Sequence, residues 1–361
     1  MTASRREILA RLGFGCLFIP AIARAPRSVL GNLLFDPDAP LVPPKPVPVN
    51  PFTRDGKALV AIIHGQDVPS MVREGLRLLG GLERLSVAGK RVLLKPNVVN
   101  DRPPPTTTNP AVVSAVASLM RASGAAEVTV GDSSGIIRFP TSGNLIATGI
   151  QAAAEAVGAR AVSFDEVTPQ PWLRVEPPEA KALPSYYVSR VAYEAEVFIN
   201  LPVVKTHRFA HYSCCLKNLV GIAHPRNRPS VAFLMGDWHE RIAELNLAVH
   251  PQLHIADGTT VMIAGGPTSG TPAPADLLML SGDGVALDAV ALALVRTFGA
   301  WEKVQQGSVW DQRQIKRARE LGLGVNGPAQ VELVSATISG NSKSVEQRVE
   351  AIRKDVMRIG G

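Results

Sequence analysis

The sequence predicts an α/β protein built on a mostly parallel open sheet with flanking helices, with its ligand site at the carboxyl ends of the strands. From Lys57 onward, short apolar runs alternate with longer amphipathic patterns, which is typical of parallel strands joined by crossover helices. Polar residues also follow several of the apolar runs directly. With 361 residues, 46% of them hydrophobic and 19% charged, the chain is large and apolar enough to bury a substantial core.

Residues 1–25 predict a twin-arginine export signal. Arg5 and Arg6 precede an apolar stretch over residues 12–22, and Ala23-Arg24-Ala25 supplies small residues at the spacing of a cleavage site. We therefore expect the twin-arginine export machinery as a partner and a periplasmic or extracellular mature protein. The alternative is a short N-terminal helix that contains an arginine pair by chance.

Loss of this leader, with its four arginines and one glutamate, lowers the net charge from +7 to +4. That charge is too small to indicate a nucleic-acid partner, and no basic run is interleaved with aromatic residues. No later apolar stretch reaches the length of a membrane span, so we expect none in the mature protein. The remaining cysteines, Cys214 and Cys215, are adjacent, which argues against a structural disulfide framework.

The elements of the domain follow in order. Residues 26–56 predict an extended arm, because residues 37–52 hold seven prolines, and residues 57–361 predict one α/β domain. Asn109-Pro110 is a good N-cap and first-turn pair for one of its helices, which Gly124 closes. Apolar runs predict strands at 58–63, 91–99, 126–131, 161–164, 196–205, 253–258, 276–282 and 330–335. Helical patterns cover 68–82, 111–124, 144–159, 237–249, 285–299, 310–321 and the residues after Ser344.

Four polar groups stand just after predicted strands: Lys95-Pro96-Asn97, Asp132-Ser133-Ser134, Lys205-Thr206-His207 and Asp257-Gly258. In open α/β sheets ligands bind outside the carboxyl ends of the strands, so these groups are the candidate site. Lysine is costly to bury unless it meets an anion, and both Lys95 and Lys205 leave apolar strands, with Lys217-Asn218 close in sequence. The pattern favours a site for a carboxylate or phosphate. The alternative is lysines whose ammonium groups reach solvent.

Asp132 and Asp257 are candidate bases or metal ligands, although an aspartate at a strand end is also a common turn-former. Ser133 and Ser134 are candidate ligand donors, but the surrounding residues do not form G-x-S-x-G. Six of the seven histidines lie between His207 and His254. A metal set of His207, His211, Cys214 and Cys215 follows if the segment is helical, since residues i and i+4 share a face. The alternative is core-facing cysteines and hydrogen-bonding histidines.

Several ordered motifs resemble the domain-of-unknown-function 362 family: GKRVLLKPNVV, TTNPAVVSAVASLMRASGAAEVTVGDSSG, FINLPVVKTH, LKNLVGIAHP, HIADG, SGDGVALDAVA and ARELGLGV. The resemblance covers most of the mature chain and implies no particular activity. Some members of that family carry ferredoxin-type cysteine runs, and this sequence has none, so no iron–sulfur cluster is implied. The family is in turn distantly similar to the nickel-pincer lactate racemase group, which uses lysine and histidines around a nicotinate-derived cofactor.

The sequence thus predicts an exported enzyme acting on a small anionic molecule by acid–base chemistry. It does not identify a cofactor, and a metal ion is one candidate. The candidate catalytic residues are His207, Lys205 and Asp132. The candidate substrate-binding residues are Lys95, Asn97, Ser133, Ser134, Lys217, Asn218 and Asp257. The alternative is a periplasmic protein that uses the same residues to bind an anion or a metal without catalysis.

Overall fold

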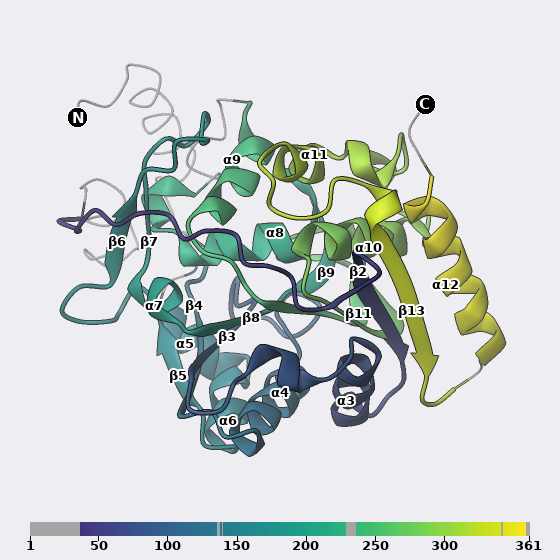
Figure 1. The fold of residues 1–361 in the computed structure, drawn as a ribbon, viewed down its shortest axis with the longest axis horizontal. Helices are drawn as coiled ribbons and strands as arrows, with labels where there is room; N and C mark the ends of the chain where they lie inside the picture. The colour runs from purple at the N-terminus through teal and green to yellow at the C-terminus, as the bar shows by residue number, and fades with distance from the viewer. Residues whose placement is uncertain (1–36, 136–137, 139, 229–235, 341, 359–361) are drawn as a thin grey trace.

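The structure is a computed structural model that describes residues 37–358, apart from 136–137, 139, 229–235 and 341. The predicted signal peptide, residues 1–25, lies outside the described residues. The predicted α/β class is confirmed, since a large, mostly parallel sheet lies between two layers of helices (Figure 1). No helix in the described ranges is long and apolar enough to cross a membrane.

The large sheet contains β1 (Thr53–Arg54), β2 (Lys57–His64), β3 (Arg91–Pro96), β4 (Glu127–Asp132), β5 (Arg160–Ser163), β8 (Val197–Leu201), β9 (Val203–His207), β10 (His211–Ser213), β11 (Leu253–Gly265), β12 (Gly270–Ser281) and β13 (Val331–Thr337). A separate hairpin contains β6 (Trp172–Val175) and β7 (Tyr186–Ser189). The helices are α3 (Val68–Leu78), α4 (Pro110–Ala122), α5 (Thr141–Ala147), α6 (Ile150–Glu155), α7 (Arg190–Glu194), α8 (Cys215–Asn218), α9 (Trp238–Glu244), α10 (Gly284–Arg296), α11 (Arg313–Glu320) and α12 (Ser342–Val356).

The strands of the large sheet follow the order β1-β2-β12-β11-β8-β3-β4-β5. The run β11-β8-β3-β4-β5 is parallel throughout, so the carboxyl ends of these strands point the same way. β12 runs antiparallel to both β11 and β2, because β11 and β12 form a long hairpin. The short predicted strand at 253–258 therefore continues to Gly265, and the glycine-rich segment after it makes the hairpin turn.

The core lies on both faces of the sheet because the central strands alternate their side chains. In β2, Leu59, Ala61 and Ile63 face the core with α3 and α4, whereas Val60 and Ile62 face the core with α10. Helix α10 contacts the sheet on one side and α11 and α12 on the other, as Figure 1 shows. This double coverage explains why α10 is apolar around most of its circumference.

Two predicted elements are divided in the structure. The helix expected over 144–159 is α5 and α6, separated at Gly149, whose φ of 76° is a left-handed conformation that ends a helix. The strand expected over 196–205 is β8 and β9, separated at Pro202, which cannot donate a ladder hydrogen bond. β9 then continues past the end of β3 and carries Lys205 and His207.

The proline-rich arm is extended where it is described, and it lies along the domain from β6 toward β2 (Figure 1). Val42 N donates to the Arg174 carbonyl at 2.9 Å, and Lys45 N donates to the Ala248 carbonyl at 3.0 Å. Phe52 is fully buried just before β1. Backbone hydrogen bonds and one aromatic anchor therefore attach this segment to the domain.

Candidate functional site

The carboxyl ends of β3 and β4 are joined by a buried ion pair. Lys95 Nζ lies 2.6 Å from Asp132 Oδ1, and the two side chains are 0% and 3% exposed. Oδ1 lacks a hydrogen bond of good geometry, so the contact is an ion pair, while Oδ2 accepts from Val98 N at 2.7 Å. Burial lowers the pKa of Lys95 from its ordinary value, and Asp132 opposes that shift. Gly221 packs directly over the pair, where a Cβ atom would collide with both side chains.

Lys205, on β9, donates to two neutral acceptors. Its Nζ is 2.8 Å from Asn97 Oδ1 and 2.6 Å from the Thr106 carbonyl, and the residue is 1% exposed. No carboxylate in the described part of the chain forms an ion pair with it. Burial, reinforced by the nearby charge of Lys217, lowers the pKa of Lys205 to about 7. A neutral lysine amine has two N–H donors, so these two acceptors also suit the uncharged form.

Lys217, on α8, is a cation without a counter-ion among the described residues. Its Nζ makes no hydrogen bond or ion pair there, although the side chain is partly buried. Burial, and then the charges of Arg228 and Lys95, lower its pKa to about 8. Arg228 donates through Nε to the Ala223 carbonyl at 2.9 Å and through its terminal nitrogens to Ser133 Oγ at 2.6 Å and the Ser134 carbonyl. Burial lowers the pKa of Arg228 to about 10.

These side chains form what we call the cationic cluster: Lys95, Lys205, Lys217 and Arg228. Besides burial, the charge of Arg228 lowers the pKa values of Lys95 and Lys217, and the charges of Lys217 and Lys95 lower the pKa of Lys205. The described carboxylates that interact with the cluster are Asp132 and Asp165, and burial raises the pKa of Asp165 against opposing contacts from Ser133 and Arg228. Positive charge therefore exceeds negative charge among these groups. Because unpaired buried charge is costly, the cluster suits an anionic ligand.

His207 is adjacent to the cluster and is held neutral. Its Nδ1 accepts from Phe209 N at 3.2 Å and from Ala210 N at 3.0 Å, so the proton is assigned to Nε2. Burial, followed by the charges of Lys217 and Lys205, lowers the pKa of His207 well below its ordinary value. In this tautomer Nε2 carries an N–H group that can donate a hydrogen bond, and it has no free lone pair with which to accept a proton. Of the acid and base roles expected for His207, the structure therefore favours that of an N–H donor through Nε2.

The other predicted binding residues divide between the cluster and its supports. Asn97 Nδ2 donates to Asn218 Oδ1 at 2.9 Å, so these two amides bind each other beside Lys205. Ser133 contacts Arg228, as described above. The Ser134 hydroxyl donates to the Val98 carbonyl at 2.7 Å and accepts from Asn144 Nδ2 at 2.8 Å. Ser134 is fully buried, and its hydroxyl is occupied by these protein contacts.

Asp257 lies within β11 instead of at its end, and its carboxylate is saturated by hydrogen bonds. Oδ2 accepts from Asn109 N at 2.8 Å, and Oδ1 accepts from Thr259 N and Oγ1 at 3.1 and 2.7 Å. Burial raises its pKa, and these hydrogen bonds oppose the shift. Asp257 therefore has the turn-forming role, because its carboxylate connects the beginning of α4 to a bulge in β11.

The helical arrangement assumed for the metal set of His207, His211, Cys214 and Cys215 is wrong. Residues 203–213 form the β9–β10 hairpin, in which His207 and His211 are paired across the strands. The His211 ring packs edge-on against His239, with ring centroids 4.9 Å apart. The two cysteines follow β10 and are fully buried. The hairpin therefore separates the histidines from the cysteines.

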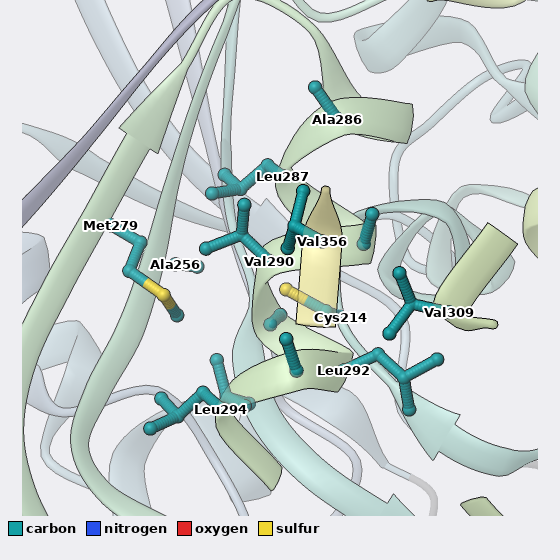
Figure 2. Close-up of a cluster of buried hydrophobic side chains, with 14 of the residues drawn as sticks. Cys214, Ala256, Met279, Ala286, Leu287, Val290, Leu292, Leu294, Val309 and Val356 are labelled. Carbon is teal, nitrogen blue, oxygen red and sulfur yellow. The ribbon is translucent and has the colours of Figure 1, made fainter. Parts of the chain in front are cut away.

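The structure instead brings together Cys214, Cys215 and Asp288, whose potential ligand atoms lie within 4.8 Å of one another. Asp288 already accepts hydrogen bonds from Cys215 N, Leu216 N and Tyr212 Oη at 2.5, 3.2 and 2.9 Å. Burial raises the pKa of both thiols and raises that of Asp288 to about 6. Figure 2 shows Cys214 among apolar side chains of α10 and its neighbours. The donors are thus better suited to capping α8 and filling the core than to holding a cation.

Three residues near the cluster were not predicted: Arg228, Gly221 and Asn200. Asn200 is a single amide inside the apolar run Val197–Leu201, and a buried polar residue of this kind was the available sequence signal. Arg228 and Gly221 carried no such signal, since arginine is usually exposed and this glycine matters only through its tertiary neighbours.

The chain is thus an α/β protein in which lysines at the carboxyl ends of parallel strands lie with Lys217 of α8 and Arg228 in one cluster with an excess of positive charge. The chain belongs to the family described as a domain of unknown function, DUF362, whose family model matches residues 92–293. A thylakoid-associated protein of Synechocystis sp. is 29% identical over 238 residues, which are 61% of this chain and 67% of that relative.

Two solved structures show remote likeness. A protein from Thermotoga maritima has a TM-score of 0.42 at 14% identity over 71% of this chain, and the match spans 60% of that protein. The lactate racemase apoprotein from Thermoanaerobacterium thermosaccharolyticum has a TM-score of 0.38 at 10% identity, covering 83% of this chain and 87% of its own.

Proposed function

We propose that this protein is an exported enzyme that binds a small carboxylate or phosphate at the cationic cluster and moves a proton with Lys205. The observation that carries this proposal is the excess of buried positive charge, above all Lys217, which has no counter-ion among the described residues. An anion in contact with Lys217 offsets the cost of holding this charge away from water. A side chain that titrates near neutral pH, adjacent to the bound anion, suits proton transfer.

The residues divide the work as follows. Lys217 and Arg228 hold the negative charge of the substrate, and Lys95 is fixed by Asp132, so that pair orients the site without contacting the reacting atoms. The neutral amine of Lys205 accepts a proton from the substrate and becomes an ammonium, which later returns the proton. His207 Nε2–H donates a hydrogen bond to a substrate oxygen, where negative charge develops.

Binding is tested by calorimetry with inorganic phosphate and with acetate, on the purified chain without an affinity tag. The wild type is expected to bind at least one of them, and Lys217→Gln is expected to weaken that binding at least tenfold. Lys316→Gln is the matched control, because Lys316 is an exposed lysine on α11. Equal affinity of the wild type and Lys217→Gln would remove the cluster as the anion site.

Catalysis is tested by mass spectrometry of small molecules that co-purify with the wild type and are lost from a Lys205→Ala/His207→Ala variant. Acids found in this way are then incubated with the protein in D₂O, and exchange of carbon-bound hydrogen is followed by NMR. We expect exchange with the wild type and none with Lys205→Met. Anion binding without exchange of any co-purifying acid would contradict the enzyme proposal.

The second candidate function is anion binding without catalysis. It is favoured by the nearly complete burial of Lys95 and Lys205, because buried side chains are less accessible to the reacting atoms of a substrate. The close approach of Cys214, Cys215 and Asp288 adds a metal ion to this candidate, in competition with the three hydrogen bonds that Asp288 accepts. Elemental analysis of untagged protein tests it: a stoichiometric metal that is lost in Cys214→Ser/Cys215→Ser supports the metal site. Absence of metal in the wild type rules out a resident ion there.

Export is a separate part of the proposal, and it rests on the pattern of residues 1–25. Replacement of Arg5 and Arg6 by lysine is expected to retain the protein in the cytoplasm, as cell fractionation would show. Unchanged export of that variant would exclude the twin-arginine route.

A further inference from the structure

A continuous chain of asparagine amides connects Lys205 with His254. Lys205 Nζ donates to Asn97 Oδ1 at 2.8 Å, and Asn97 Nδ2 donates to Asn218 Oδ1 at 2.9 Å. Asn218 Nδ2 then donates to Asn200 Oδ1 at 2.8 Å, and Asn200 Nδ2 donates to His254 Nδ1 at 3.1 Å. Asn200, Asn218 and His254 are 0%, 2% and 5% exposed, and Asn97, next to Lys205, is partly buried.

The direction of this chain is set by backbone carbonyl groups, which only accept hydrogen bonds. Asn218 Nδ2 also faces the carbonyls of Lys95 and Pro96 at 3.2 and 3.4 Å, and Asn200 Nδ2 faces the Cys215 carbonyl at 3.1 Å. Rotating either amide by half a turn would bring two oxygens together. Asn218 must therefore direct its oxygen toward Asn97, which leaves the Asn97 oxygen for Lys205.

The far end of the chain has the same polarity. Because Asn200 donates to Nδ1, the His254 ring is neutral with its proton on Nε2, and burial lowers the pKa of His254 to about 3. The histidine is therefore a hydrogen-bond acceptor at neutral pH. Both ends thus favour one orientation of all three amides.

We propose that Asn200 is a positioning residue for Lys205. Through Asn218 and Asn97, Asn200 holds the side-chain oxygen of Asn97, and not its N–H group, against the lysine amine. His254 ends the chain as its neutral acceptor. The inference rests on the proposed function only in giving Lys205 a proton to move, since the positioning itself is a property of the folded protein. An amide oxygen stabilises the ammonium less than a carboxylate does, so the lysine retains both protonation states near neutral pH.

The test is an NMR titration of the full chain labelled with ¹³C at the ε-carbon of lysine, with the Lys205 resonance assigned by its loss in Lys205→Met. The Asn200→Ala substitution interrupts the amide chain at a residue that does not contact Lys205, because Asn97 and Asn218 lie between them. We expect the titration midpoint of Lys205 to fall by about half a unit or more, because the ammonium loses a fixed acceptor. Asn246→Ala is the matched control, since Asn246 is a buried amide that donates to the Leu216 and Ile242 carbonyls outside this chain.

A second variant keeps the proposal testable if Asn200→Ala does not fold. Asn97→Asp places a carboxylate where the amide oxygen meets Lys205, and we expect the midpoint to rise by about 1 unit or more. The positioning role is overturned if Asn200→Ala leaves the midpoint unchanged, if Asn246→Ala moves it equally, or if Asn97→Asp has no effect. These readouts are independent of anion binding, so a failed binding experiment does not decide them.

Discussion

Lys95 and Asp132 form an ion pair across neighbouring parallel strands, with 2.6 Å between Nζ and Oδ1 and at most 3% of either side chain exposed. Both residues stand at the carboxyl ends of their strands, β3 and β4, which are parallel neighbours in the sheet. The pair therefore neutralises one cation of the cluster and leaves Lys205 and Lys217 without an ion-pair partner among the described residues.

Asp132→Asn is expected to destabilise the protein by about 3–5 kcal/mol, because it leaves Lys95 buried without a counter-ion. The free energy of unfolding from urea titration measures this effect. Glu332→Gln is the control, since Glu332 pairs with Arg54 at the surface with side chains 32% and 52% exposed, and we expect a cost of about 0–1 kcal/mol. Similar costs for the two variants would show that the buried pair is not structural.

Lys217→Met is expected to raise the thermal midpoint of the protein measured without added anion, because it removes an uncompensated cation while keeping the apolar stem. The same variant should lose the stabilisation that phosphate or acetate confers on the wild type. Differential scanning calorimetry with and without the anion checks both effects. A lower midpoint in the absence of anion would indicate that the ammonium is already stabilised by the protein.

Gly221→Ala is expected to cost about 1–3 kcal/mol, since its methyl group would collide with Lys95 and Asp132 in a packed interior. Gly143→Ala is the matched control: the methyl group would meet only Pro140, at 3.6 Å, on an exposed position of α5. There we expect a gain of about 0.5–1 kcal/mol, because alanine is the better helix former. Urea titration of both variants tests the pair, and equal effects would contradict the close packing over the ion pair.

The buried histidines should make stability fall with acid. Burial lowers the pKa of His224 to about 3, so between about 6.5 and 3 the unfolded chain binds a proton at this site that the folded protein does not. This single group then removes about 1.4 kcal/mol per pH unit as the pH falls through that window. Asp288, whose pKa is raised to about 6, acts in the opposite direction. A variant is therefore needed to isolate the histidine.

His224→Asn retains an acceptor for the Arg226 N–H at the start of a short 3-10 turn and removes the titrating ring. Its free energy of unfolding, measured at pH 7, 6, 5 and 4, should fall less steeply than that of the wild type. Parallel curves for the two proteins would mean that His224 titrates alike in the folded and unfolded states.

Asp288→Asn is expected to cost about 2–4 kcal/mol, because the carboxylate accepts three hydrogen bonds at the beginning of α8. Tyr212→Phe should cost about 1–2 kcal/mol by removing one of those donors. A double-mutant cycle measured by urea titration is expected to give a coupling above about 0.5 kcal/mol. Additive effects would contradict the buried hydrogen bond between the two side chains.

Local sequence patterns predict the α/β class, the places of most strands and helices, and the polar groups at the strand ends. These properties depend on local features: apolar periodicity, the Asn109-Pro110 cap, and the abrupt change from apolar to polar residues at Lys95, Asp132 and Lys205. Gly149 and Pro202 are residue types that commonly end a helix or a strand, but the apolar patterns continue on both sides of them and predict single elements.

The pairing of those polar residues with each other depends on the packing of distant segments and is seen only in the folded structure. Asp132 is neutralised by Lys95, and the Asp257 carboxylate accepts hydrogen bonds from Asn109 and Thr259. Lys217 forms no ion pair with a described carboxylate. The amide chain joins residues as far apart as Asn97 and Asn218, which are separated by 121 positions. Charge compensation and hydrogen-bond direction depend on such contacts between distant segments, and local sequence patterns do not encode them.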